Sequence, residues 1–245
     1  DSFFQAAESF FRNAQTNGLL SEVRERFYGH LDQLNYVGAK RFQKQTDKKL
    51  AKYDDLFQQA ADRHDLDWRL LAAMSYQESH WNPRAKSFTG VRGMMMLTRR
   101  TAKELGVRNR LDPKQSIDGG AAYLVKLRKR LPKEIQEPDR TWMALAAYNV
   151  GYGHLTDARK LAKKDGGDNS RWMDVKDYLP LLSQKRYYKQ TRHGYARGSE
   201  PVTYVQNIRR YFDVLVWNDN PDLELALETE SMQLSADIRV IPPLL

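Results

Sequence analysis

A single glutamate stands at the end of an apolar helical run in the first half of the chain. It lies in the stretch SYQESHWNP, residues 75–83, and Leu70, Leu71 and Met74 precede Glu78 at the three- and four-residue spacing of an amphipathic helix. Glu78 therefore shares the predicted buried stripe. Burial of a carboxyl without a counter-charge raises its pKa, so that the group keeps its proton near neutral pH. A carboxyl in that state is suited to act as a general acid.

The signals at the two ends of this helix place Glu78 in or near its last turn. An aspartate, Asp67 or Asp65, is a suitable N-cap, and Pro83 prevents the helix from running much further. Two alternatives to a catalytic role stay open for Glu78. Its side chain reaches solvent at a fraying helix end, or it forms an ion pair with a nearby arginine, Arg84 or Arg92.

An amide lies at a comparable position in a second apolar run, TWMALAAYNVGYG. Trp142, Leu145 and Asn149 are spaced by three and four residues, just before a glycine break. A buried amide must find hydrogen-bond partners, and a sugar acetamido or hydroxyl group is one candidate. The alternative is that Asn149 caps its own helix beside Gly151.

Two more features carry less specific signals. In SFTGVRGMMMLT, Gly90 and Gly93 permit close backbone approach, and the methionines at 94–96 form either a soft binding wall or core filler. Tyr204 begins a late helix, where its hydroxyl is placed to hydrogen-bond a carboxyl or its ring to pack in the core.

Helical periodicity dominates the chain, and no set of alternating strands, repeat or low-complexity tract is evident. The sequence therefore predicts a mainly α protein. The helical segments that we expect lie within residues 1–28, 56–61, 70–79, 98–105, 112–131, 140–149, 154–164, 175–189 and 200–217.

The composition narrows the function classes. The chain has 245 residues, enough for one good-sized domain with extensions, and lacks cysteine, which excludes disulfides, thiolate metal sites and a cysteine nucleophile. We expect no cofactor and no metal, and the opening residues are those expected of the middle of a longer protein. The net charge of +9 favours a polyanionic partner, but no nucleic-acid-binding motif appears, so we predict no nucleic-acid function.

Taken together, these stretches resemble the catalytic domain of family 1 lytic transglycosylases, the goose-lysozyme-like group that cleaves bacterial peptidoglycan. The resemblance covers about residues 50–217. It rests on Glu78-Ser79, Gly93 with the methionines 94–96, residues 147–151 (AYNVG) and Tyr204.

The resemblance implies a lysozyme-like (goose-type) domain and an arrangement of the chain in three parts. Residues 1–45 would be a helical N-terminal extension, the tail of an upstream solute-binding-like regulatory module plus a linker. Residues 46–217 would be the catalytic domain, and 218–245 a C-terminal tail. The implied partners are peptidoglycan glycan strands and stem peptides, together with that upstream module. The implied location is the periplasm, with outer-membrane association of the full-length protein.

The resemblance also implies the chemistry and the residues that perform it. Glu78 would act as general acid and then base in a non-hydrolytic cleavage of the MurNAc-GlcNAc β-1,4 bond, which leaves a 1,6-anhydro-MurNAc end. The residues implied to bind substrate are Ser87, Met95, Met96, Tyr148, Asn149 and Tyr204, with Tyr204 holding Glu78. Met96 stands where most relatives have glutamine, which places one sugar contact in doubt because a thioether cannot donate a hydrogen bond.

Two further functions of the same fold stay open from the sequence. A muramidase that uses water would share the acid, and a peptidoglycan-binding module with weakened catalysis would be consistent with Met96.

Overall fold

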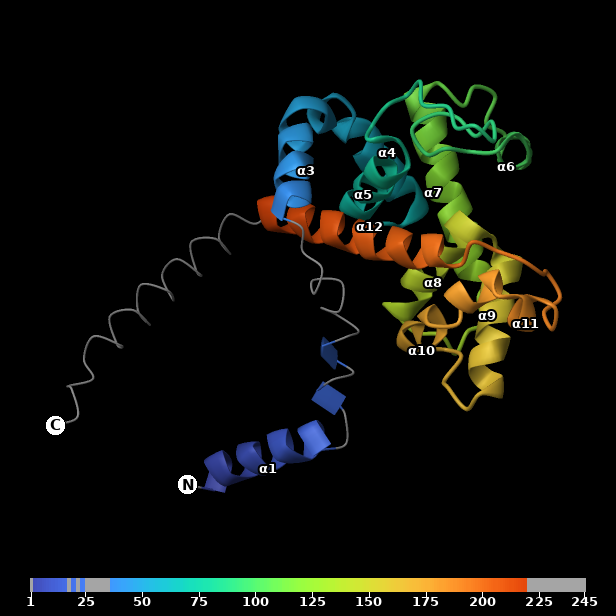
Figure 1. Cartoon of the computed structure of the whole chain (residues 1–245). Helices are drawn as coiled ribbons and strands as arrows, with labels where there is room; N and C mark the ends of the chain where they lie inside the picture. The colour runs from blue at the N-terminus through green and yellow to red at the C-terminus, as the bar shows by residue number, and fades with distance from the viewer. Residues whose placement is uncertain (1, 17–18, 21–22, 25–35, 220–245) are drawn as a thin grey trace, which may run out of the picture.

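The computed structural model describes residues 2–16, 19–20, 23–24 and 36–219, and within these residues helices dominate (Figure 1). The only extended pairing in that part consists of two isolated bridges, Lys86 with Arg92 and Arg92 with Leu97. The mainly α prediction is confirmed. The helices in chain order are α1 (Ser2–Thr16), α3 (Tyr36–Lys49), η2 (Leu50–Lys52), α4 (Asp54–His64), α5 (Trp68–Ser79), α6 (Arg99–Glu104), α7 (Pro113–Arg130), α8 (Asp139–Val150), α9 (Tyr152–Lys164), α10 (Trp172–Lys176), η3 (Pro180–Ser183), α11 (Lys185–Tyr188) and α12 (Ser199–Asn218).

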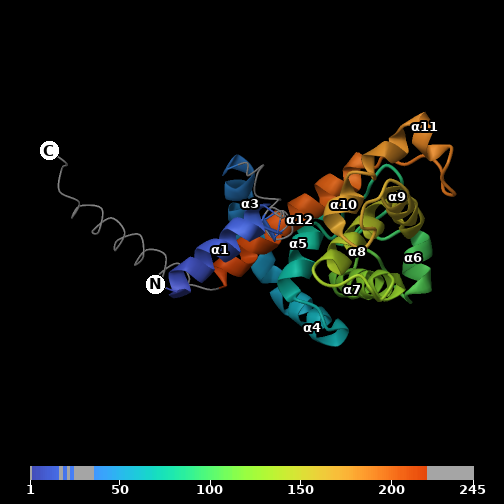
Figure 2. The ribbon, with the colours of Figure 1, turned by 90° about the horizontal axis from the view of Figure 1, so that it is seen from below.

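The long helix α12 organises the core because it packs against both α5 and α8. Figure 1 shows it crossing the middle of the body, and Figure 2 shows the same helix from below. Its inner face carries Tyr204, Ile208 and Leu215, all buried. These side chains are four and seven residues apart, a spacing that places them on one face of α12 and removes that face from water. The helix thus joins the segment that carries Glu78 to the segment that carries Asn149.

Helix α5 has the ends that its sequence predicts. The side chain of Asp67 accepts a hydrogen bond from the backbone N–H of Arg69 at 2.8 Å, so Asp67 is the N-cap. At the other end, His80 and Trp81 both have positive φ, and the chain turns away before Pro83. The indole of Trp81 is buried and donates to the carbonyl of Ala72 at 2.9 Å, which fixes this turn against the helix.

Gly93 is required by the close approach of two backbone segments. Its φ is +86°, and a Cβ at this position would collide with the carbonyl oxygen of Arg110. The methionines that follow, Met94 and Met95, are fully buried. The turn at 93–96 is therefore pressed against the body of the protein.

The N-terminal helices differ in how they are covered. α1 leaves the rings of Phe3, Phe4, Phe10 and Phe11 largely exposed. By contrast, Phe42 of α3 is fully buried and stacks on Tyr211 with ring centroids 4.6 Å apart. The predicted boundary between residues 45 and 46 falls inside α3. The predicted tail 218–245 lies outside the described residues, apart from Asn218 and Asp219.

Candidate active site

Glu78 and Tyr204 meet where α5 lies against α12. The hydroxyl of Tyr204 donates a hydrogen bond of 2.7 Å to Oε1 of Glu78, and the tyrosine is only 4% exposed. Glu78 is partly buried in the last turn of α5 and forms no ion pair with any described lysine or arginine. An ion pair with Arg84 or Arg92 is therefore wrong for this glutamate. A carboxyl with one neutral donor and no counter-charge remains at the helix end.

The surroundings of Glu78 favour its protonated form. Burial raises the pKa of this carboxyl to about 7, while the hydrogen bond from Tyr204 acts in the opposite direction and limits the rise. Burial, and secondarily the charge of Glu78, raises the pKa of both Tyr204 and Tyr148 well above the usual value. Both phenols thus stay hydrogen-bond donors, and Glu78 is the group that exchanges a proton near neutral pH.

The turn at 93–96 is attached to three helices by hydrogen bonds to its backbone. The carbonyl of Met94 accepts from the hydroxyls of Ser79 at 2.9 Å and Ser75 at 3.3 Å, both on α5. The N–H of Met95 donates to Ser116 of α7 at 3.2 Å. Its carbonyl accepts from the hydroxyl of Tyr148 on α8 at 2.8 Å. The turn is thereby held in register with the end of the Glu78 helix.

Ser79 and Ser75 were not among the residues predicted for the site. The signal for them was present, because Ser75 and Ser79 are four residues apart and therefore share one face of the helix that carries Glu78. Ser79 also accepts a hydrogen bond from the N–H of Asn82 at 3.2 Å. This serine thus connects the end of α5, the turn that follows it and the turn at 93–96, called the methionine turn below.

The predicted substrate-binding residues are distributed unevenly around Glu78. Tyr204 bonds to Glu78 directly, the charge of Glu78 acts on Tyr148, and Met95 accepts a hydrogen bond from Tyr148 through its backbone carbonyl. The hydroxyl of Ser87 is engaged within its own turn, 2.9 Å from the hydroxyl of Thr89. Met96 is partly buried and has a φ of +45°, a strained value for a residue with a side chain.

Asn149 differs from the expectation of a buried amide. It is exposed, because it is the penultimate residue of α8 and lies past the packed part of that helix. It lines a hollow of about 410 Å³ beside the site. The residues that line this hollow are Gln77, Asn149, Ser199, Glu200, Thr203 and Tyr204.

Glu200 is a second carboxyl near the site that sequence reasoning missed. It stands in the first turn of α12, four residues before Tyr204, and is exposed with a 3.4 Å ion pair to Arg197. Its spacing from Tyr204 was readable in the sequence, since residues four apart share a helix face. Unlike Glu78, it faces water.

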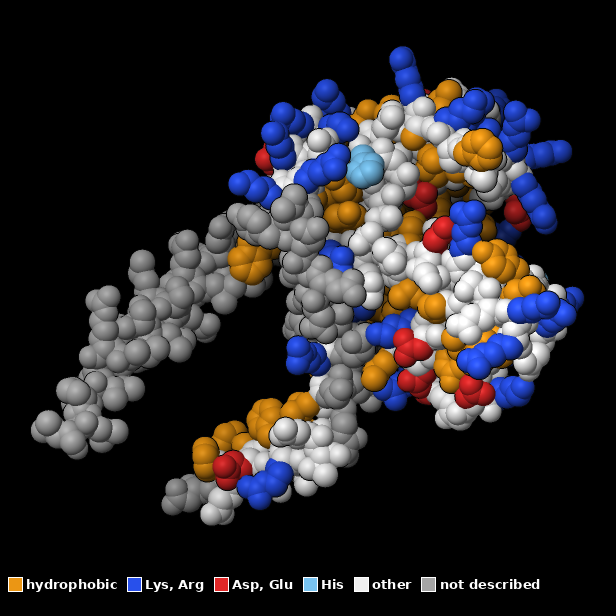
Figure 3. All heavy atoms as spheres, viewed as in Figure 1, with side chains coloured by type: hydrophobic (Ala, Val, Ile, Leu, Met, Phe, Trp, Pro, Cys, Tyr) orange, Lys and Arg blue, Asp and Glu red, His pale blue; other side chains and the backbone are white. Residues whose placement is uncertain are grey.

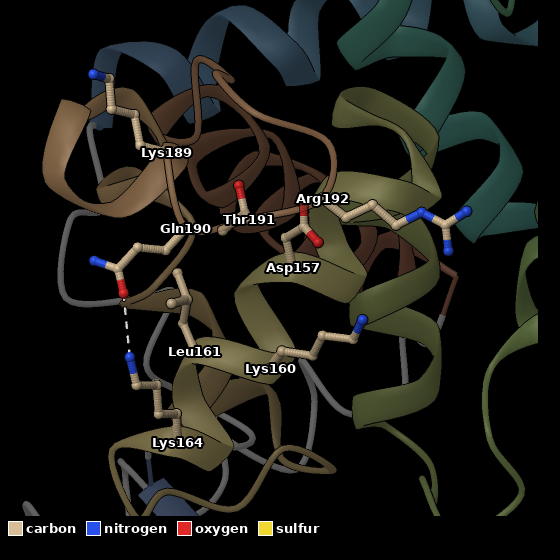
Figure 4. Close-up of a pocket in the computed structure, with 8 residues that line it drawn as sticks. All are labelled: Asp157, Lys160, Leu161, Lys164, Lys189, Gln190, Thr191 and Arg192. Carbon is tan, nitrogen blue, oxygen red and sulfur yellow. Dashed lines mark hydrogen bonds between the residues drawn. The ribbon is translucent and has the colours of Figure 1, made fainter.

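A separate basic hollow of about 420 Å³ lies between α9 and residues 189–192 (Figure 4). Lys160, Lys164, Lys189 and Arg192 surround it, and the buried Asp157 lies at its edge. The carboxyl of Asp157 is occupied by His193, whose backbone N–H donates to it at 2.8 Å. None of the predicted site residues lines this hollow.

The segment that contains Glu78 matches a known protein family. Residues 55–170 match the family model described as "Transglycosylase SLT domain". The chain contains an SLT domain. Glu78, the methionine turn and Asn149 fall inside the matched range, whereas Tyr204 lies beyond it, on the helix that packs against the matched segment.

Relatives of this chain extend the similarity beyond the SLT domain. A protein of Stutzerimonas stutzeri (strain A1501) named membrane-bound lytic murein transglycosylase F is 59% identical over 224 residues, which are 91% of this chain and 46% of the relative. A protein of the same name from Marinobacter nauticus is 58% identical over 222 residues, 91% of this chain and 44% of the relative. The chain thus spans less than half the length of these curated relatives.

A solved structure supports the fold of the SLT domain. An inactive mutant of the lytic transglycosylase Slt from Pseudomonas aeruginosa superimposes with a TM-score of 0.51 at 20% sequence identity, covering 69% of this chain and 24% of that protein. The expected lytic-transglycosylase fold is confirmed. At this identity the comparison concerns the fold alone.

The raised pKa of Glu78 predicts a pH-dependent cost to folding. Because the pKa of this carboxyl rises from 4.5 to about 7, the native state binds more protons than the unfolded chain between these pH values, and stability falls as pH rises through them. We expect Glu78→Gln, which cannot ionise, to raise the free energy of unfolding at pH 8 by up to about 3 kcal/mol. At pH 4 the two proteins should be equally stable. Urea unfolding at both pH values measures this, and a constant difference between the two proteins would contradict it.

Proposed function

We propose that the SLT domain is a peptidoglycan lytic transglycosylase that cleaves the MurNAc-GlcNAc β-1,4 bond without water. The observation that carries this proposal is the single carboxyl Glu78, uncompensated by any described cation and held by the Tyr204 hydroxyl at 2.7 Å. A pKa of about 7 gives such a carboxyl both protonation states near neutral pH. One residue is thus suited to give a proton and to take one back.

In the first step, Glu78 donates its proton to the glycosidic oxygen. The bond between that oxygen and C1 of the muramic sugar breaks, and the GlcNAc alcohol leaves. The oxygen of the 2-acetamido group bonds to C1 and gives a cyclic oxazolinium. The sugar's own amide therefore takes the place of the second carboxylate that most glycosidases supply.

In the second step, Glu78, now a carboxylate, accepts the proton of the C6 hydroxyl. The O6 atom attacks C1, the bond between C1 and the amide oxygen breaks, and the 1,6-anhydro ring closes. Glu78 is protonated again and no water is consumed. The hydrogen bond from Tyr204 stabilises the carboxylate stage, because a donor to the charged form favours it.

The remaining site residues have positioning roles in this proposal. Asn149, exposed beside the hollow that Tyr204 also lines, would bind the sugar amide. Ser87 would assist from its turn, and Tyr148 would line the cleft while fixing the backbone of Met95. Met96 would offer an apolar contact where most relatives offer an amide.

The wider setting belongs to the same proposal. Residues 1–45 would connect to a regulatory module, and the exposed phenylalanine face of α1 supports packing against a further part of a longer protein. Glycan strands and stem peptides would be the substrate, in the periplasm at the outer membrane. Among the described residues, no helix combines the length and the apolar character needed to cross a bilayer.

One observation favours a second candidate function, a hydrolytic muramidase. Glu200 places another carboxylate beside the hollow next to Tyr204, and a second carboxylate is what activates water in inverting glycosidases. Its carboxylate is exposed to solvent and lies 3.4 Å from Arg197, which leaves it open to a water molecule.

Digestion of purified peptidoglycan sacculi distinguishes the two reactions. We expect soluble muropeptides whose sugar ends are lighter by one water than the hydrolytic products, as mass spectrometry of the released fragments will measure. Digestion in ¹⁸O-labelled water provides the control, because a transglycosylase incorporates no label. Labelled reducing ends would establish the muramidase instead, and sacculi that bind the protein without release would establish a binding module.

A further inference from the structure

A cluster of arginines lies on the face formed by residues 86–110, apart from the Glu78–Tyr204 pair. Burial and the neighbouring charges of Arg92 and Arg99 lower the pKa of Arg110, so both of these guanidinium groups lie close enough to Arg110 to act on it. Arg110 is fixed in place because it donates to the carbonyls of Gly90 at 3.0 Å and Leu97 at 2.8 Å. Like charges are therefore gathered here by the fold.

No described carboxylate neutralises this cluster. The ion pairs among the described residues do not include Arg92, Arg99, Arg108 or Arg110. The acid of the neighbouring helix, Glu104, is paired with Lys126 instead. The Nε of Arg92 is buried and has no hydrogen-bond acceptor among the described residues. Buried donors are normally satisfied, so this N–H of Arg92 is a donor that an acceptor from outside the described residues could take up.

The surface around the cluster is hollowed on both sides of Arg99. One hollow, of about 550 Å³, runs along α6 to Arg110, and the other, of about 600 Å³, lies over the loop at 86–92. Both include Arg99 in their walls. Figure 3 shows lysine and arginine side chains projecting over α6 and the loops beside it. The surface is broad and basic and is not a single enclosed pocket.

An apolar side chain projects from the same surface. Phe88 is fully exposed in the loop that carries Lys86 and Arg92. The exposed ring of Phe88 contributes no burial energy to the fold. An apolar ring beside arginines without ion pairs is the arrangement found on surfaces that bind at the membrane interface.

We propose that this arginine surface, defined by Lys86, Phe88, Arg92, Arg99, Lys103, Arg108 and Arg110, docks the domain on anionic phospholipid headgroups. Phosphodiester oxygens would pair with the forked guanidinium groups, and Phe88 would enter the boundary between headgroups and acyl chains. The competing anions are carboxylates of peptidoglycan stem peptides. They supply no apolar phase for Phe88, which is why lipid is the better match. The proposal does not depend on the proposed function.

Vesicle co-sedimentation of the full chain tests the proposal. Vesicles of phosphatidylcholine with about 30% phosphatidylglycerol should bind the protein at least tenfold more tightly than pure phosphatidylcholine, and 0.5 M salt should remove the difference. The pure phosphatidylcholine arm also measures any binding through the exposed phenylalanines of α1. The triple variant R99Q/K103Q/R108Q removes exposed side chains and should lose at least tenfold, since each cation contributes about fivefold.

The matched control is K160Q/K164Q/K189Q, which removes the same charge from the basic hollow of Figure 4. Its affinity for the phosphatidylglycerol vesicles should fall by less than about threefold. Phe88→Ser should weaken binding about fivefold with the salt dependence unchanged. Thermal melting confirms that each variant is folded.

Three outcomes would overturn the proposal. Equal losses in the two triple variants would mean that only net charge matters. Equal binding to both vesicle types would exclude headgroup recognition. If R99Q/K103Q/R108Q lost binding to soluble acidic muropeptides but still bound the vesicles, the surface would be assigned to stem peptides. Because the vesicles contain no peptidoglycan, Glu78→Gln should bind them like the wild type, which separates this test from that of the proposed function.

Discussion

Glu78→Gln should lower the rate of anhydro-muropeptide release by about 10²- to 10⁴-fold, the usual contribution of a general acid or base. Glutamine has nearly the same shape and still accepts the hydrogen bond from Tyr204, but it can neither give nor take a proton. Both proposed steps pass through this carboxyl, so the loss should appear in kcat more than in KM. Initial rates of release from purified sacculi, with mass analysis of the sugar ends, measure it.

Two other acids serve as controls for this result. Glu134 is exposed and makes no hydrogen bond or ion pair with the described site residues, so Glu134→Gln should retain the wild-type rate. Glu200→Gln tests the second carboxylate directly, because Glu200 lines the hollow beside Tyr204. A loss with Glu200→Gln as large as that with Glu78→Gln would contradict the single-carboxyl mechanism and favour the muramidase.

Gly93→Ala should destabilise the protein by about 3 kcal/mol or more. The new Cβ would collide with the backbone carbonyl of Arg110, and a backbone atom cannot move aside as the end of a flexible side chain can. The positive φ adds strain for any residue with a side chain. Since the turn at 93–96 is attached to α5, α7 and α8, the displacement should also disturb Glu78. Urea unfolding and the release assay measure the two effects.

Gly90→Ala is the matched control in the same loop. Gly90 has nearly the same φ, +84°, but a Cβ there would have no neighbour within 4 Å. This substitution should cost only the backbone strain, about 1 to 2 kcal/mol. Equal destabilisation by the two alanines would show that conformation alone, and not the contact with Arg110, requires glycine at position 93.

Local signals in the sequence were enough to predict the position of Glu78 and most of the helices. They missed α3 (Tyr36–Lys49), whose polar, lysine- and glutamine-rich sequence lies in none of the expected helical segments. Apolar spacing located α5, Asp67 capped it as expected, and the stripe on α12 brought Tyr204 inward. These features depend on residues three or four apart, so the sequence specifies them without knowledge of the tertiary fold. The bond between Tyr204 and Glu78 joins residues 126 positions apart, and only the family resemblance anticipated it.

Features that depend on where a helix ends in space could not be predicted in the same way. Asn149 shares a stripe with Leu145, yet it lies one turn too far along α8 to be covered. The clustering of the arginine surface could not be predicted from the sequence for a related reason. Arg92, Arg99 and Arg110 are spread along the chain, and the one acid between them in the sequence, Glu104, is paired in space with Lys126 instead. Their proximity is a property of the folded loop.

The path of the methionine turn is determined by atoms that any amino acid at those positions would share. Serine and tyrosine hydroxyls donate hydrogen bonds to the backbone carbonyls of Met94 and Met95. Gly93 is required because any side chain there would collide with the backbone of Arg110. Substitution at position 96 can therefore alter what an incoming sugar touches without relocating the strand of chain that presents it. Sequence drift in such a turn would retune ligand preference while the proton-transfer apparatus stays undisturbed.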